Sequence, residues 1–310
     1  MIGIKAIGSY IPQNFIDNYE RVKEFETNAG FIRDKIGFET LSRKSRLEET
    51  SDLCVKAFED LLSHSSFSID SIDCLIVCTQ NPDGAGIPQT SAILHHKLRL
   101  DDNVAAFDIS LGCSGYIYGL SVLKAFMTEN GLKKGLLFTA DPYSKVLDRS
   151  DRNTELLFGD AATCTLLCEQ PEYIMLKSRF ATGGSAGDSI FVDKATSLLS
   201  MKGKDIFMFS MKKVPVQIKE CLADNSLNKE QIDIFIFHQA SKYIVDNLTK
   251  SMGLPGEKVP FLAQKTGNTV SSSIPLVLRE LLSSAYQHVL LSGFGVGLSW
   301  ATTILKKSDQ

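Results

Sequence analysis

Short apolar runs alternate with segments of helical spacing along the whole chain. Residues 74–79 (CLIVCT) are apolar on both faces, as in a strand buried within a sheet. In the segment 51–62, Leu53, Ala57 and Leu61 fall on one face of a predicted helix, and a further helix is expected at 89–97. Strands that alternate with helices in this way favour an α/β fold with parallel or mixed sheets.

The same alternation continues to the C-terminus. Further strands are expected at 1–10, 104–109, 135–140, 163–168, 173–180, 234–238, 288–293 and 298–306, and further helices at 115–123, 212–223, 241–252 and 271–284. Residues 17–49 are charged and mostly helix-forming, with breaks at Gly30 and Gly37. This segment is expected to cover the surface.

One pattern occurs twice. Residues 71–80 (SIDCLIVCTQ) and 231–239 (QIDIFIFHQ) each contain an Ile-Asp pair, an apolar strand and a terminal glutamine. The repeat predicts two copies of a βαβ-rich unit, an N-terminal half over 1–171 and a C-terminal half over 172–310. The alternative is a chance similarity between two unrelated βαβ units.

A cysteine stands between glycines where a strand turns into a helix. Cys113, in Gly112-Cys113-Ser114-Gly115, follows the strand 104–109 and precedes a helical pattern. Free N–H groups at a helix start, together with the helix dipole, stabilise a thiolate. The turn therefore suggests a nucleophile. The alternative is a small apolar residue that fills the core.

The other cysteines indicate core positions. Cys74 and Cys78 lie four residues apart in one apolar run, and Cys164 and Cys168 in another. This spacing places the two cysteines of each pair on the same face of a strand. The spacing contains no tight metal-ligand pattern, and we expect no bound metal. Such usage suits a reducing cytoplasm, where we expect the protein to reside. The seven cysteines are Cys54, Cys74, Cys78, Cys113, Cys164, Cys168 and Cys221.

Composition narrows the classes of partner. The 310 residues are 44% hydrophobic and 22% charged, which is enough to bury a large core. With a net charge of −3, the protein has no overall positive potential that would attract nucleic acid or anionic lipid. The N-terminus lacks the pattern of an export signal, and no apolar run reaches the length of a membrane span. Neither nucleic acid nor membrane is expected as a partner.

Two residues in the second half belong with Cys113 if the halves are copies. His238 ends the strand equivalent to the one ending at Thr79, and Asn268 occupies the turn equivalent to that of Cys113. Because ligands bind at the carboxyl ends of strands in open α/β sheets, all three are expected in one pocket. A cysteine with two such groups suggests nucleophilic catalysis assisted by two hydrogen-bond donors. Taken alone, His238 fits a core histidine, and Asn268 fits a plain turn.

The C-terminal segment 292–300 (SGFGVGLSW) has glycine at alternate positions between two strands. Such a bend can direct backbone N–H groups at a developing oxyanion, since glycine has no Cβ to block the approach. The alternative is a tight hairpin. A phosphate loop is excluded, because no Gly-Lys-Ser/Thr follows.

Taken in order, these motifs resemble a known family. The motifs around Cys113, Phe158-Gly159-Asp160, His238, Gly267-Asn268 and 292–300 are similar to those of the type III 3-oxoacyl-acyl-carrier-protein synthases. The resemblance extends over residues 1–306. It implies a thiolase-like fold, a five-layered αβαβα sandwich of two pseudo-symmetric halves, and a homodimer.

The resemblance also implies a reaction. Cys113 would take an acyl group from acyl-CoA, and His238 and Asn268 would bind the carbonyl of a malonyl thioester on an acyl carrier protein. Loss of CO₂ would then form the carbanion that attacks the acyl group. The backbone N–H groups of Cys113 and Val296 would hold the oxyanion. No cofactor is implied beyond these substrates.

Several positions depart from the family pattern. Val296 stands where glycine is usual, and Phe31 and Lys35 stand where a Trp and an Arg often hold the adenine of CoA, while Arg152 matches a second adenine contact. Ile87 matches a position, often Phe, that closes the acyl pocket from the partner subunit. A smaller residue there predicts a longer or branched acyl chain. Ser241 and Tyr243 replace residues that include an Arg used in carrier-protein docking.

Other functions have to be weighed against condensation. The same fold and Cys113 could transfer an acyl group to an amine or a hydroxyl without loss of CO₂. A thiolase is disfavoured because no second cysteine lies near the C-terminal glycines, and a hydroxymethylglutaryl-CoA synthase because no acidic residue lies near 79–81. A non-catalytic subunit is disfavoured by the presence of Cys113.

Overall fold

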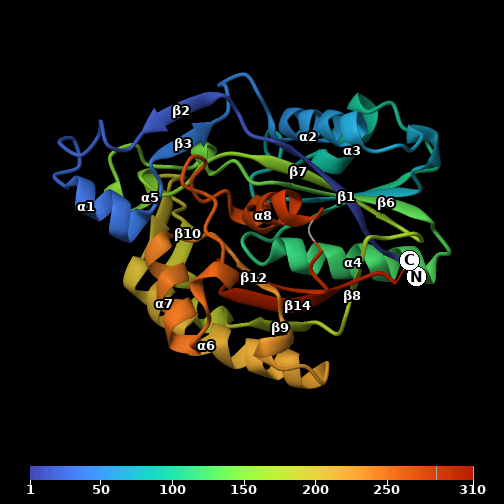
Figure 1. Cartoon of the computed structure of the whole chain (residues 1–310). Coiled ribbons are helices and arrows are strands. Elements are labelled where there is room, and N and C mark those ends of the chain that lie inside the picture. Colours follow the sequence, from blue (N-terminus) through green and yellow to red (C-terminus); the bar gives the residue numbers. More distant parts are fainter. Residues whose placement is uncertain (284, 310) are drawn as a thin grey trace.

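Helices form three layers around two layers of strands (Figure 1). This computed structural model describes residues 1–283 and 285–309. α2 and α3 cover the first sheet, α4 and α8 lie between the sheets, and α6 and α7 cover the second sheet. The helices are α1 (Ala29–Phe31), α2 (Thr50–His64), α3 (Thr90–Lys97), α4 (Gly115–Glu129), α5 (Arg152–Glu155), α6 (Gly203–Asp224), α7 (Lys242–Met252) and α8 (Ser273–Leu281). The predicted αβαβα sandwich is confirmed.

The first sheet has the strand order β5-β4-β6-β7-β1. β4 pairs in parallel with β5 and β6, and β7 pairs antiparallel with β6 and β1. Its strands are β1 (Gly3–Tyr10), β4 (Cys74–Cys78), β5 (Ala105–Ile109), β6 (Lys134–Ala140) and β7 (Ala162–Cys168). Parallel β4 is buried at all five residues, as its apolar sequence predicts.

The second sheet repeats this pairing. β12 (Ile234–Phe237) pairs in parallel with β13 (His288–Gly295), which pairs antiparallel with β14 (Ser299–Lys307). β14 in turn pairs antiparallel with β8 (Tyr173–Met175) and β9 (Arg179–Thr182). No strand is assigned to residues 259–263, where a counterpart of β5 would lie. A single pair, Ile4 with Tyr173, joins the two sheets, and the boundary at 171 stays a prediction.

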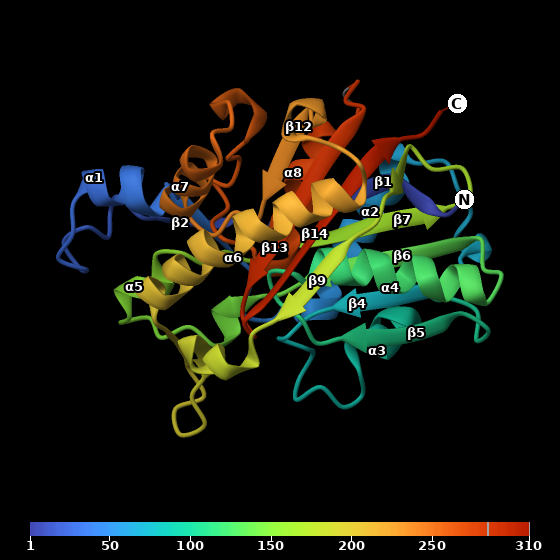
Figure 2. The same ribbon diagram turned by 90° about the horizontal axis from the view of Figure 1, so that it is seen from below.

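A view turned by 90° shows how helices from each half cover their sheets. α6 lies across β13 and β14, while α4 lies along β4 and β6 (Figure 2). α6 begins at Gly203, earlier than the helix expected from residue 212. Its buried face extends back through Ile206 and Ser210 at helical spacing, which accounts for the longer helix.

The expectation of mostly helix over 17–49 is wrong. Apart from α1 and one turn at Ile32–Ile36, the segment has no helix, and β3 (Thr40–Arg43) pairs with β2 (Asn14–Asp17). Backbone contacts with the second half account for the difference, since Glu39 N–H donates to Gln264 O at 2.7 Å and Ser42 N–H to Thr266 O at 3.1 Å. Tertiary pairing thus overrides local helix propensity. A second small hairpin joins β10 (Ile190–Val192) to β11 (Leu199–Met201).

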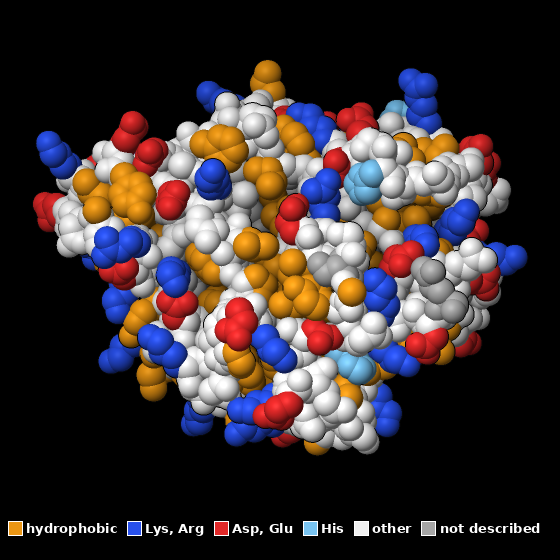
Figure 3. Space-filling view, viewed as in Figure 1, with side chains coloured by type: hydrophobic (Ala, Val, Ile, Leu, Met, Phe, Trp, Pro, Cys, Tyr) orange, Lys and Arg blue, Asp and Glu red, His pale blue; other side chains and the backbone are white. Residues whose placement is uncertain are grey.

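Charges of both signs are interspersed over the face seen in Figure 3. The seven cysteines, all among the described residues, are buried and free, so the core positions predicted for Cys74, Cys78, Cys164 and Cys168 are confirmed. Among the helices that the structure describes, none has the length and apolar character needed to cross a bilayer.

Candidate active site

Cys113 lies on the turn between β5 and α4, and the C-terminal glycine bend packs directly on it. Its side chain is buried. A Cβ at position 295 would stand 2.6 Å from the Cys113 sulfur, and a Cβ at 293 would stand 2.6 Å from the Cys113 carbonyl oxygen. Only glycine permits this approach. Alternate glycines in the segment 292–300 therefore bring the second half onto the predicted nucleophile of the first.

The electrostatic environment of Cys113 combines two opposing effects. Burial raises the pKa of the thiol to about 12, and the nearby carboxyl of Asp141 also raises it. The backbone N–H groups of Val296 and of Cys113 itself lower the pKa, because they donate to the sulfur. Burial outweighs these donors, so the resting side chain is the neutral thiol.

His238 follows β12 and is also buried. Burial lowers the pKa of its imidazole to about 3, so the ring is neutral at physiological pH. Its Nδ1 lies 2.7 Å from the hydroxyl oxygen of Ser273, at the start of α8. When the Ser273 hydroxyl donates to Nδ1, the ring proton is on Nε2, which is then a donor.

Asn268 is held by its own turn. Its Oδ1 accepts the backbone N–H of Val270 at 2.9 Å, and its Nδ2 donates to Ala240 O at 3.5 Å. Its backbone is tied to the Phe158-Gly159 segment, with Asn268 N–H donating to Leu157 O at 2.8 Å and Gly159 N–H donating to Asn268 O at 3.0 Å. Because Oδ1 already accepts a hydrogen bond, the amide can offer a ligand only the second N–H of Nδ2 as a donor.

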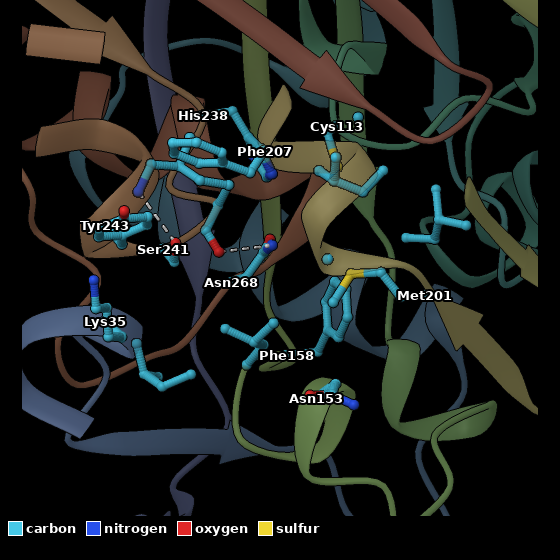
Figure 4. Close-up of a pocket in the computed structure, with 18 of the residues that line it drawn as sticks. Lys35, Cys113, Asn153, Phe158, Met201, Phe207, His238, Ser241, Tyr243 and Asn268 are labelled. Carbon is cyan, nitrogen blue, oxygen red and sulfur yellow. Dashed lines mark hydrogen bonds between the residues drawn. The ribbon is translucent and has the colours of Figure 1, made fainter. Parts of the chain in front are cut away.

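Cys113, His238 and Asn268 line one cavity of about 210 Å³. Figure 4 shows the three side chains around this cavity, with Lys35 and Tyr243 on the side away from Cys113. The predicted residues that line the cavity are Phe31, Lys35, Cys113, Arg152, His238, Asn268 and Val296. Ile87 does not line it; this residue is 94% exposed, on the loop 81–88.

Aromatic and cationic side chains form the outer part of the cavity. The Arg152 guanidinium lies 5.6 Å from the centre of the Phe31 ring. The Lys35 ammonium stands 3.6 Å from the centre of the Tyr243 ring, which stacks on Phe207 at 5.2 Å. Phe31 is thus paired with Arg152, while Lys35 is paired with Tyr243.

Sequence reasoning missed two buried polar residues near these side chains. Ser273 lies in a run of three serines, and only the fold shows which of them meets His238. Asp141 directly follows the predicted strand 135–140, a signal that could have found it. Its Oδ1 accepts from Gln80 N–H and from Asn81 Nδ2, both at 3.0 Å, and its Oδ2 has no partner among the described residues. Burial raises the pKa of Asp141 to about 7.

A buried cysteine on a strand-to-helix turn, with imidazole and amide donors in the same cavity of an αβαβα sandwich, defines a thiolase-fold condensing enzyme. Comparison with known proteins identifies the family. Residues 107–184 match the model of 3-oxoacyl-[acyl-carrier-protein] synthase III, and residues 222–307 match the model of its C-terminal part. The chain belongs to the 3-oxoacyl-acyl-carrier-protein synthase III family.

Relatives match over almost the whole chain. The beta-ketoacyl-[acyl-carrier-protein] synthase III of Lactococcus lactis is 33% identical over 97% of this chain and 98% of its own. A solved 3-oxoacyl-(acyl-carrier-protein) synthase III superposes with a TM-score of 0.92 at 30% identity, covering 98% of this chain and 99% of its own. The priming beta-ketosynthase of the R1128 polyketide pathway superposes with a TM-score of 0.89 at 26% identity, covering 100% of this chain and 97% of its own.

Ser273→Ala tests how His238 is held. Without the Ser273 hydroxyl, the proton is no longer fixed on Nε2, and we expect decarboxylation of a malonyl thioester to slow about tenfold. Acyl transfer to Cys113 is expected to continue at the wild-type rate. Ser271→Ala is the matched control, because the buried Ser271 hydroxyl has no partner among the described residues. Equal decarboxylation rates for the Ser273 and Ser271 variants would contradict this role.

Asp141→Asn tests the charge beside Cys113. Ionised Asp141 raises the pKa of Cys113, so removal of the carboxylate is expected to increase the rate of iodoacetamide labelling about threefold at pH 8. At pH 6, below the pKa of about 7, wild-type Asp141 is mostly protonated and the two rates should converge.

Cys113→Ser measures background labelling for this test, and the exposed Asp101→Asn controls for a change of net charge. A rate ratio between the Asp141 variant and wild type that does not change with pH would count against this effect of Asp141.

Proposed function

We propose that Cys113 carries an acyl group that this enzyme condenses with a malonyl thioester to give a 3-oxoacyl thioester. The observation that carries the proposal is one cavity lined by a buried thiol, a neutral imidazole and an amide from three separate segments. The family to which the chain belongs is a family of condensing enzymes, and the roles of individual residues are our assignment.

Acyl transfer comes first. The Cys113 sulfur attacks the carbonyl carbon of acyl-CoA, the bond from that carbon to the CoA sulfur breaks, and the thiol proton ends on the CoA sulfur. The carbonyl oxygen is negative in the intermediate. The N–H groups of Cys113 and Val296 are our candidates for its stabilisation, because both already point at the sulfur. Loss of one such donor typically costs about 3 kcal/mol.

Condensation follows. His238 Nε2 and Asn268 Nδ2 donate to the carbonyl oxygen of the malonyl thioester, so that CO₂ leaves and its electron pair forms an enolate. The enolate carbon attacks the carbonyl of acyl-Cys113, a C–C bond forms, and the bond to the Cys113 sulfur breaks. The Cys113 thiolate that leaves then takes a proton from water. A neutral His238, with a pKa of about 3, stabilises the enolate without protonating its carbon.

The substrates enter through the outer part of the cavity. Phe31, Lys35 and Arg152 are our candidates for contacts with CoA, since all three line the cavity on its aromatic and cationic side. The malonyl group arrives on an acyl carrier protein, a substrate in keeping with the names of the relatives. No cofactor is needed beyond these substrates, and the seven free thiols suit the cytoplasm.

The protein acts as a homodimer in this proposal. β5 is the outer strand of the first sheet, so one of its edges is free to pair with another copy. Ile87, almost fully exposed in one chain, would then close the acyl pocket of the partner. Sedimentation is expected to give twice the chain mass of 34.1 kDa. A monomer at micromolar concentration would refute the dimer.

The alternative is acyl transfer from Cys113 to an amine or a hydroxyl without decarboxylation. Such a reaction has no use for two donors that stabilise an enolate, and His238 and Asn268 both line the cavity. The two reactions differ in one product, because only condensation releases CO₂ from a malonyl thioester.

The deciding experiment separates the two half-reactions. Wild-type protein is expected to gain acyl mass from acyl-CoA and to release CO₂ from malonyl thioester, and Cys113→Ala to lose the acyl adduct. His238→Ala and Asn268→Ala should keep the adduct and lose about 100-fold or more in CO₂ release. Mass spectrometry and trapped labelled CO₂ give the two readings. Absence of an adduct from a panel of acyl-CoAs would overturn the function.

A further inference from the structure

A second cavity, of about 340 Å³, lies next to the cavity that contains Cys113. Val296 and Ile190 are the two side chains that line both. Beyond them, the second cavity has an apolar wall that includes Val146 and Leu199. These two shared residues therefore separate the reacting sulfur from further space.

The Val296 side chain packs closely against the turn that contains Cys113. A Cβ at Gly112 would stand 2.5 Å from Val296 Cγ1 and 2.6 Å from Gln80 Oε1. The Val296 side chain thus packs against the residue before Cys113, while its backbone N–H points at the Cys113 sulfur. A group attached to the sulfur meets Val296 before it can reach the second cavity.

The order of substrates determines where the acyl group can go. After acylation, a malonyl thioester has to reach His238 and Asn268 through the outer side of the cavity, where Lys35 and Tyr243 lie (Figure 4). An acyl chain that extended to that side would occupy the same space. The chain therefore has to extend away from it, toward Val296, Ile190 and the second cavity.

We propose that Val296, together with Ile190, is a barrier that restricts the acyl group on Cys113 to short chains. The proposal rests on the proposed function and adds the residues that limit the length of its acyl group, against the longer chain that the smaller Ile87 alone would predict. A branched side chain is stiff and cannot rotate out of the way as an unbranched one can. Glycine at 296 joins the two cavities, and the apolar wall then receives a longer alkyl chain.

Competition between two acyl donors tests the barrier. Each variant is incubated with an equimolar mixture of acetyl-CoA and octanoyl-CoA, and the two adducts on Cys113 are measured by intact-protein mass spectrometry. For Val296→Gly, we expect the ratio of octanoyl to acetyl adduct to rise at least about tenfold over wild type, with a smaller rise for Ile190→Ala. Because both donors use the same backbone N–H groups, the ratio cancels a general loss of rate.

Met201→Ala is the matched control. Met201 lines the cavity of Cys113 but not the second cavity, so the variant adds space without opening the barrier, and its ratio should equal that of wild type. Val296→Ala provides a milder test should the glycine variant fold poorly. Unchanged ratios in the Val296 and Ile190 variants, with both adducts present, would overturn the barrier alone. If wild type and every variant gave neither adduct, the proposed function would be overturned instead.

Discussion

At two points beside the cavity residues, the C-terminal half and the N-terminal half approach so closely that only glycine fits. A Cβ on Gly159 would stand 1.8 Å from Thr266 O, and a Cβ on Gly295 would stand 2.6 Å from the Cys113 sulfur. Glycine at both points sets the position of Asn268 and of the C-terminal bend relative to Cys113. The geometry of the cavity therefore depends on backbone packing between halves rather than on the rotamers of long side chains.

This packing also keeps the Cys113 and His238 side chains uncharged. Cys113 and His238 are buried, and burial favours the neutral form of each. Neither side chain is a cation that could offset a developing oxyanion, and the cationic Lys35 and Arg152 line the outer part of the cavity, so stabilisation beside Cys113 has to come from oriented N–H groups. Such donors act strongly where water is excluded. Burial therefore has two effects: it keeps Cys113 and His238 neutral, and it strengthens the hydrogen bonds that N–H groups donate.

The main elements and the three central side chains could be predicted because each has a local signal. Cys113 stands between glycines at a turn, and the repeat relates the segments of His238 and Asn268 to it. Ser273 and the helix-poor segment 17–49 could not be predicted, since their states depend on contacts with residues far away in sequence. Ile87 is almost fully exposed in the single chain, so its predicted place at the acyl pocket of a partner subunit stays a prediction.

The two glutamines of the internal repeat now have different surroundings. Gln80 lines the second cavity, where its Oε1 accepts the Tyr143 hydroxyl at 3.0 Å. Gln239 instead ties the loop after α7 to the edge of the second sheet, accepting Leu262 N–H at 3.0 Å and donating to Phe237 O at 2.8 Å.

That loop stands where the first half has β5, and β12 is therefore an edge strand. An edge covered in this way is protected from pairing with another chain. The two similar segments thus have different surroundings. β5 is an outer strand of the first sheet, whereas the loop after α7 lies beside β12, and the second half supplies His238 and Asn268 to the cavity.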